Sequence, residues 1–192
     1  QEHPIYLEDT GTDIRYYVYA KGDIKAAYTS PADAIVYADA EQGVVIDNNN
    51  QLIWERGGRY NSHIIAGIEN IKASSDINSM EACAYMLLGA VHVSADIKDI
   101  KGRDESILDI LGKYTDNAVN LTGCSFDEVL YYVSGDRPVI GMLDDNHAVI
   151  ITAYTANSVT IYDPVTGASQ TMLHTAADSM FGSAGNVFIS VA

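Results

Sequence analysis

Two apolar segments separated by a short polar turn constrain the fold more than any other part of the sequence. The first runs from His147 to Tyr154 and the second from Val159 to Asp163, and both are rich in the β-branched and aromatic residues that favour strands. A third apolar run, 138–143, precedes them. Strands joined by such short turns pair antiparallel. The pattern predicts an antiparallel sheet with a histidine opening one strand and an aspartate closing the next.

The length of the turn decides whether these two side chains share a face of the sheet. A two-residue loop, Ala156–Asn157, would place His147 and Asp163 on opposite faces, because a one-residue change of register reverses every side chain. An odd-length loop, such as a three-residue loop that includes Thr155, or a bulge would make them diagonal neighbours on one face. Sharing a face would bring an imidazole beside a carboxylate, which is half of a catalytic triad. The alternative is that the histidine and the Asp163-Pro164 pair only shape turns.

The first sixty residues are typical of a small separate unit. Ser30 and Pro31 start a helix, since serine caps helices and proline fits the first helical position, and Gly43 ends it. Strands are predicted on both sides of this helix, at 14–20, 24–28, 43–47 and 51–55. We expect a ββαββ domain over residues 1–60, a linker at 56–59 and a second domain over 61–192.

The second unit begins with helices and ends with strands. Asn78 or Ser79 caps a helix that runs to about His92, and Glu81 completes a capping-box spacing from Asn78. Further helices are predicted at 104–113, 125–134 and 175–181, and strands at 138–143, 147–154, 159–163, 168–173 and 186–191. Helices followed by an antiparallel sheet indicate an α+β fold.

Cys83 is the candidate nucleophile. It lies near the start of the predicted helix, where the helix dipole favours a thiolate, and a thiolate beside an imidazolium is an activated nucleophile. The alternative is a core position, because Cys83, Met86, Leu87 and Ala90 form an apolar helical stripe. Cys124 precedes another helix start and is a rival thiol, but no histidine with a strand-borne carboxylate is matched to it.

Charge and composition restrict the partners. The net charge is −15 and the pI about 4.4, which opposes binding to nucleic acid or anionic lipid. No apolar run approaches the roughly 18 residues of a membrane span, so we expect no membrane insertion. The composition favours a secreted or cell-surface protein whose signal peptide is not in this chain. The oligomeric state is left open.

We expect no cofactor or metal. His92 and His174 have no ligand-like spacing to another histidine, cysteine or acid, and are interpreted as structural or surface residues. The acidic residues at 144–145 and Asn146 could bind a cation, but a solvated hairpin tip is the favoured interpretation, because an oxygen cage needs more ligands than these.

The order of a cysteine on a helix, a His-Ala-Val strand and a strand ending in Asp-Pro resembles the C39-like peptidases of the papain-like cysteine peptidase fold. The resemblance covers about residues 64–192. It implies Cys83 as nucleophile, His147 as general base and acid, and Asp163 as the group that orients the imidazole. The family's oxyanion glutamine is absent before Cys83, and Asn78 is the best substitute. The usual Cys-Gly dipeptide is absent too, since Ala84 follows Cys83.

Two hypotheses follow for the function. The first is a secreted cysteine peptidase that hydrolyses a peptide or protein substrate through the three residues above, with a transglutaminase-like acyl transferase as a close variant. The second is a catalytically inactive peptidase-like module used for binding or cell-surface assembly. The reactivity of Cys83 distinguishes them.

Overall fold

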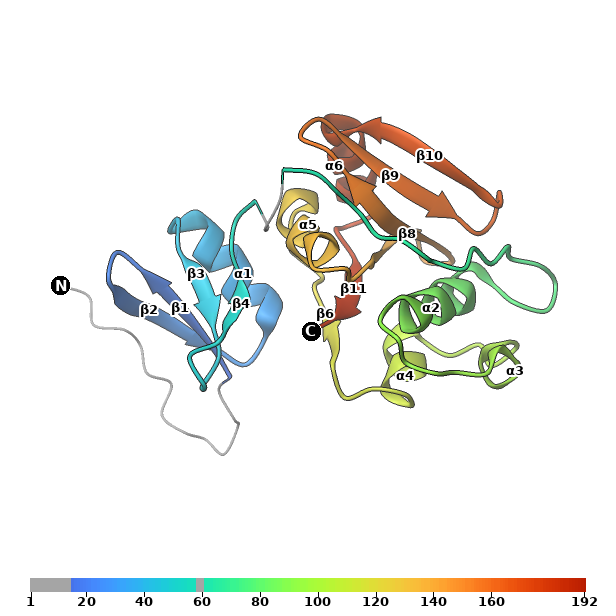
Figure 1. Cartoon of the computed structure of the whole chain (residues 1–192), viewed down its shortest axis with the longest axis horizontal. Coiled ribbons are helices and arrows are strands. Elements are labelled where there is room, and N and C mark those ends of the chain that lie inside the picture. The colour runs from blue at the N-terminus through green and yellow to red at the C-terminus, as the bar shows by residue number, and fades with distance from the viewer. Residues whose placement is uncertain (1–14, 58–60) are drawn as a thin grey trace.

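The computed structural model of the protein describes residues 15–57 and 61–192, which form two sheets with their helices (Figure 1). Ile14 and residues 58–60 of the predicted first strand and linker lie outside the described residues. The described part of the chain contains no helix that is both long enough and apolar enough to cross a membrane.

The smaller sheet comes from the N-terminal residues and has the predicted ββαββ order. Its elements are β1 (Tyr16–Ala20), β2 (Asp23–Tyr28), α1 (Pro31–Ala40), β3 (Val44–Ile46) and β4 (Leu52–Trp54), with the strands in the order β2-β1-β3-β4. Ser30 caps α1 by accepting a hydrogen bond from the main-chain nitrogen of Asp33, as the Ser-Pro start predicts.

The larger sheet has seven strands in the order β10-β9-β8-β7-β11-β6, with β5 paired to β8. Its strands are β5 (His63–Ile64), β6 (Ala118–Asn120), β7 (Val139–Asp144), β8 (His147–Tyr154), β9 (Ser158–Asp163), β10 (Ala168–Leu173) and β11 (Phe188–Val191). Its helices are α2 (Ser79–Ala90), α3 (Ile97–Ile100), α4 (Ile107–Gly112), α5 (Phe126–Ser134) and α6 (His174–Ser183). The predicted α+β class is confirmed. The short elements β5, α3 and β6 were not predicted.

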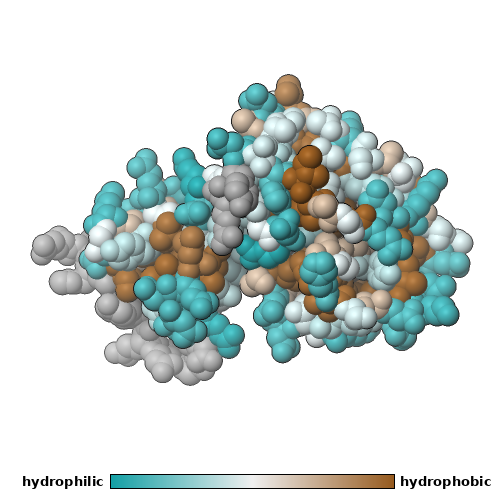
Figure 2. Space-filling model, viewed as in Figure 1, coloured by the Kyte–Doolittle hydropathy of each residue, from teal (hydrophilic) through white to brown (hydrophobic). Residues whose placement is uncertain are grey.

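Alternating side chains of β8 face two different layers of helices. Ala148 and Ile150 belong to the core shared with α2 and α4, whereas Val149 and Ile151 belong to the core shared with α5 and α6. The central strands are therefore apolar on both faces. The second core continues into the small sheet, where it includes Trp54. Outside these cores, the surface in one view is mostly hydrophilic, with apolar patches over both sheets (Figure 2).

Candidate active site

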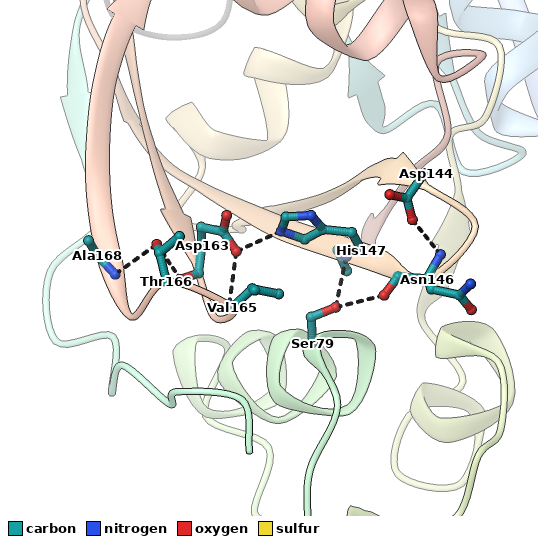
Figure 3. Close-up of polar contacts among 9 residues, drawn as sticks. Ser79, Asp144, Asn146, His147, Asp163, Val165, Thr166 and Ala168 are labelled. Atoms are coloured by element: carbon teal, nitrogen blue, oxygen red, sulfur yellow. Dashed lines mark hydrogen bonds and ion pairs between the residues drawn. The ribbon is translucent and has the colours of Figure 1, made fainter. Parts of the chain in front are cut away.

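His147 and Asp163 meet at the end of the β8–β9 pair, as the catalytic reading of the sequence requires. His147 Nε2 lies 2.8 Å from Asp163 Oδ1 (Figure 3). Both side chains are about a quarter exposed, at 26% and 21%, so solvent can reach the pair. Asp163 Oδ1 also accepts a hydrogen bond from the main-chain nitrogen of Val165, which fixes the carboxylate at the start of the next turn. A carboxylate held in this way orients the imidazole.

A β-bulge brings these two side chains together. The main-chain nitrogen of Thr155 donates to Ser158, so the turn itself has the two-residue loop that would separate His147 from Asp163. The register then shifts between Ile151 and Ala153, where one extra residue enters β8. Beyond the shift Ile150 pairs with Tyr162, and continuing this register makes Asp163 the diagonal neighbour of His147 on the same face. The shared face that the catalytic interpretation requires is present, and of the two ways to reach it the structure has the bulge and not the odd-length loop.

Ser79 is the side chain through which α2 contacts the start of β8. Its hydroxyl donates to the carbonyl oxygen of Asn146 at 3.2 Å and accepts from the nitrogen of Ala148 at 3.0 Å, so it binds the main chain on both sides of His147 (Figure 3). Ser79 is only 3% exposed. The sequence pattern predicts this serine only as a possible cap, although the capping-box spacing at Asn78 also indicates that Ser79 opens the helix.

Asn78 caps α2. Its side-chain oxygen accepts from the nitrogen of Glu81 at 2.8 Å, while its own main-chain nitrogen donates to the Glu81 carboxylate at 3.0 Å. This is the predicted capping box. The second oxygen of Glu81 accepts from the nitrogens of Arg103 and Asp104, which ties α2 to the segment after α3. The structure thus gives Asn78 a capping contact, and its proposed oxyanion role stays a prediction.

Cys83 lies in the second turn of α2 and is completely buried. With the helix starting at Ser79, the thiol is about 6 Å further along the axis, beyond the first turn in which the dipole acts. It belongs to the core that contains Ala148 and Tyr162. Within the described residues, Cys83 makes no hydrogen bond to His147. Cys83 thus lies one turn further into the helix than the predicted position near its start, and the core position on the apolar stripe describes this residue better.

The surroundings of Cys83 also oppose ionisation. Burial, and secondarily the negative charge of Asp163, raise the pKa of the Cys83 thiol well above its ordinary value, because a thiolate there would lose its hydration and face a carboxylate. Reactive cysteines need a partly exposed, electropositive setting, which is the opposite. The role of Cys83 as nucleophile beside His147 stays a prediction.

Cys124 is no better placed as a nucleophile. It is fully buried in the other core, on the α5 side of the sheet, with its sulfur 3.9 Å from the carbonyl oxygen of Ala32. Burial, followed by the charge of Glu128, raises its pKa to about 12. Both cysteines are free thiols.

The remaining polar candidates have local partners. His174 Nδ1 lies 3.5 Å from Asp127, and Asp144 accepts from the main-chain nitrogen of Asn146 within the hairpin turn. His92, in a left-handed conformation after α2, is exposed. In residues 15–57 and 61–192, no group of three histidine, cysteine or acidic side chains could hold a metal.

The sheet, the flanking helices and the His–Asp pair together define a peptidase-like α+β protein with the papain-like arrangement. Comparison with known families makes the assignment specific. The family model described as "Peptidase_C39 like family" matches residues 82–186, and the chain belongs to this family. The fold is similar to the crystal structure of a candidate C39-like peptidase from Bacillus anthracis, with a TM-score of 0.57 and 18% identity over 68% of this chain and 97% of that one. No curated protein matches the sequence.

Proposed function

We propose that this protein is a peptidase-like module that binds a peptide or protein segment beside His147 and Asp163 without cysteine-dependent hydrolysis. The observation that carries the proposal is the burial of the thiols: Cys83 and Cys124 are both 0% exposed. The chain has two cysteines in all, so a cysteine mechanism has no other nucleophile. The family and the fold supply the expectation that the ligand is a peptide.

Capture of peptides that stay intact tests this proposal. The full chain is incubated with an array of end-capped random peptides, and the captured peptides are identified by mass spectrometry. We expect His147→Asn to lose the captured set, because the imidazole lies at the solvent-accessible edge of the site. His92→Asn is the matched control, since it makes the same change at an exposed left-handed position that asparagine tolerates. Cleaved peptides, or capture that His147→Asn leaves unchanged, would contradict the proposal.

A second candidate function is peptide hydrolysis or acyl transfer, favoured by the intact His147–Asp163 bond. For a cysteine peptidase, Cys83 would have to be uncovered and turned to the imidazole. A fluorogenic peptide substrate tests this route: hydrolysis that disappears in Cys83→Ala supports the cysteine peptidase, and a substrate that the native chain leaves intact rejects it.

Secretion or display at the cell surface is part of the same proposal. The acidic composition supports it, since a net charge of −15 keeps a protein apart from anionic membranes and nucleic acid.

A further inference from the structure

Strand β10 is the outer edge of the larger sheet (Figure 1). Among the described strands it pairs with β9 alone, over all six of its residues and without a bulge. The pairing continues one step beyond the strand, because the nitrogen of His174 donates to the carbonyl oxygen of Asn157 at 3.0 Å. The outer side of β10 is therefore a regular edge, long enough for a further strand to pair with it.

The register fixes which main-chain groups of β10 point away from the sheet. Bonded and non-bonded pairs alternate along an antiparallel ladder. The bonded pair of His174 and Asn157 therefore makes the even-numbered residues of β10 bond to β9. The main-chain nitrogens and carbonyl oxygens of Ser169 and Thr171 point outward. Within residues 15–57 and 61–192 these groups have no hydrogen-bond partner, so each of the two residues offers a donor and an acceptor to another chain.

The other sheet edges are protected against pairing, and β10 is not. The edge strands β4 and β6 have three residues each, while β2 carries Asp23 and Lys25 and pairs with β1 in an interrupted register. Short strands, charges and bulges are the usual devices that keep an edge from pairing with another chain. Residues 164–177 contain no aspartate, glutamate, lysine or arginine, and β10 contains no proline. This edge is open to a partner strand.

An extended peptide fits this edge better than a second copy of the chain does. Two copies would each carry a net charge of −15, and like charges oppose association. A stable dimer also needs roughly 800 Å² of surface from each partner, far more than the edge of one six-residue strand offers. A peptide that adds a strand to a sheet needs only main-chain pairing and a few side-chain contacts.

The surroundings of β10 indicate the chemistry of such a peptide. Val165, in the turn before the strand, is 50% exposed, and Leu173, its last residue, is 62% exposed. The residues between these two apolar side chains are uncharged. β-Branched or aliphatic peptide side chains would cover this apolar surface, and they also favour the extended conformation.

We propose that β10 binds an extended, uncharged peptide segment as an additional strand of the larger sheet. The main chain of the peptide exchanges hydrogen bonds with Ser169 and Thr171, and its side chains contact Val165 or Leu173. This surface goes beyond the proposed site at His147, because β9 separates β10 from β8. Each of the two contacts can exist without the other.

Fluorescence anisotropy of a labelled peptide, titrated with the full chain, tests this proposal. The probe is an end-capped, uncharged hexapeptide of alternating threonine and valine, and we expect saturable binding. Ser169→Pro should weaken it about tenfold, because proline removes the outward donor and leaves the pairing of its neighbours with β9 in place. Ser169→Ala is the matched control, since it keeps the main-chain donor. Both Ser169→Ala and His147→Asn should bind the probe like the native chain.

A second probe, N-methylated at every inner residue, cannot donate main-chain hydrogen bonds and should not bind. A native chain that does not bind the unmodified probe, or that binds both probes equally, would overturn the proposal. So would equal weakening by Ser169→Pro and Ser169→Ala, or weakening by His147→Asn, which would place the probe at the other site. A dimer in sedimentation that Ser169→Pro dissociates would show a second copy on this edge and overturn the peptide. If Ser169→Pro does not fold, the comparison of the two probes decides alone.

Discussion

Replacing Ser79 with alanine removes both hydrogen bonds that fasten α2 to the start of β8. The nitrogen of Ala148 is fully buried and would lose its partner, which costs about 1–3 kcal/mol. The carbonyl of exposed Asn146 can turn to water, so its loss costs only about 0.5–1.5 kcal/mol. Alanine offsets part of this with its better helix propensity, by roughly 0.5 kcal/mol. We expect the free energy of unfolding to fall by about 1–4 kcal/mol.

Equilibrium unfolding in denaturant, followed by circular dichroism, measures this loss. Ser94→Ala is the matched control at an exposed position after α2 and should change the free energy by less than about 0.5 kcal/mol. A Ser79→Ala variant as stable as the Ser94→Ala control would refute the reasoning. It would mean that the Ser79 hydroxyl does not hold the helix against the hairpin.

Three further substitutions test neighbouring parts of the account. Gly141→Ala should cost about 1–3 kcal/mol, measured by thermal unfolding, since a new Cβ would lie 3.0 Å from Cδ1 of the buried Phe181 ring. Glu81→Gln should lower the free energy of unfolding in denaturant by a similar amount, roughly 1–3 kcal/mol. The amide nitrogen of glutamine can then face a donor such as the main-chain nitrogen of Arg103, which donates to the carboxylate in the native chain. Ser79→Cys should create a thiol that, like the native cysteines, stays unmodified by iodoacetamide in the folded chain, because position 79 is only 3% exposed. An unchanged stability in either of the first two, or rapid alkylation of the folded chain in the third, would count against the corresponding contact.

From the sequence, His147 and Asp163 could be predicted to meet only on the condition that the register of their two strands puts both side chains on one face. Hydrophobic alternation locates the two strands, but their register depends on the bulge at Thr152, which no residue of the strand announces in the sequence. Turn composition alone favours neither register, so the loop length and the bulge had to stay open.

The burial of Cys83 was harder to predict from the sequence. A buried cysteine and a catalytic one both fit a residue close to a capping box and on an apolar helical stripe. One helical turn separates a first-turn side chain from a core side chain on the same face, and i to i+4 spacing relates Ser79 to Cys83. Sequence spacing identified the face of α2 correctly but not which of the two residues reaches the strand end.

The contact of Trp54 with Glu128 was not predicted at all. Each residue has an ordinary local role, as the end of a short strand and as the partner of Ser125 in a capping box. Their hydrogen bond joins positions far apart in the chain, and only tertiary packing brings them together.

Alkylation of the native thiols tests the central claim most directly. The folded chain is treated with iodoacetamide near neutral pH, and mass spectrometry follows modification of Cys83 and Cys124 with and without denaturant. Burial predicts that both cysteines stay unmodified in the folded chain, that both react after unfolding, and that His147→Asn changes neither rate. Rapid modification of Cys83 in the folded chain, slowed by His147→Asn, would contradict the account and restore the cysteine peptidase.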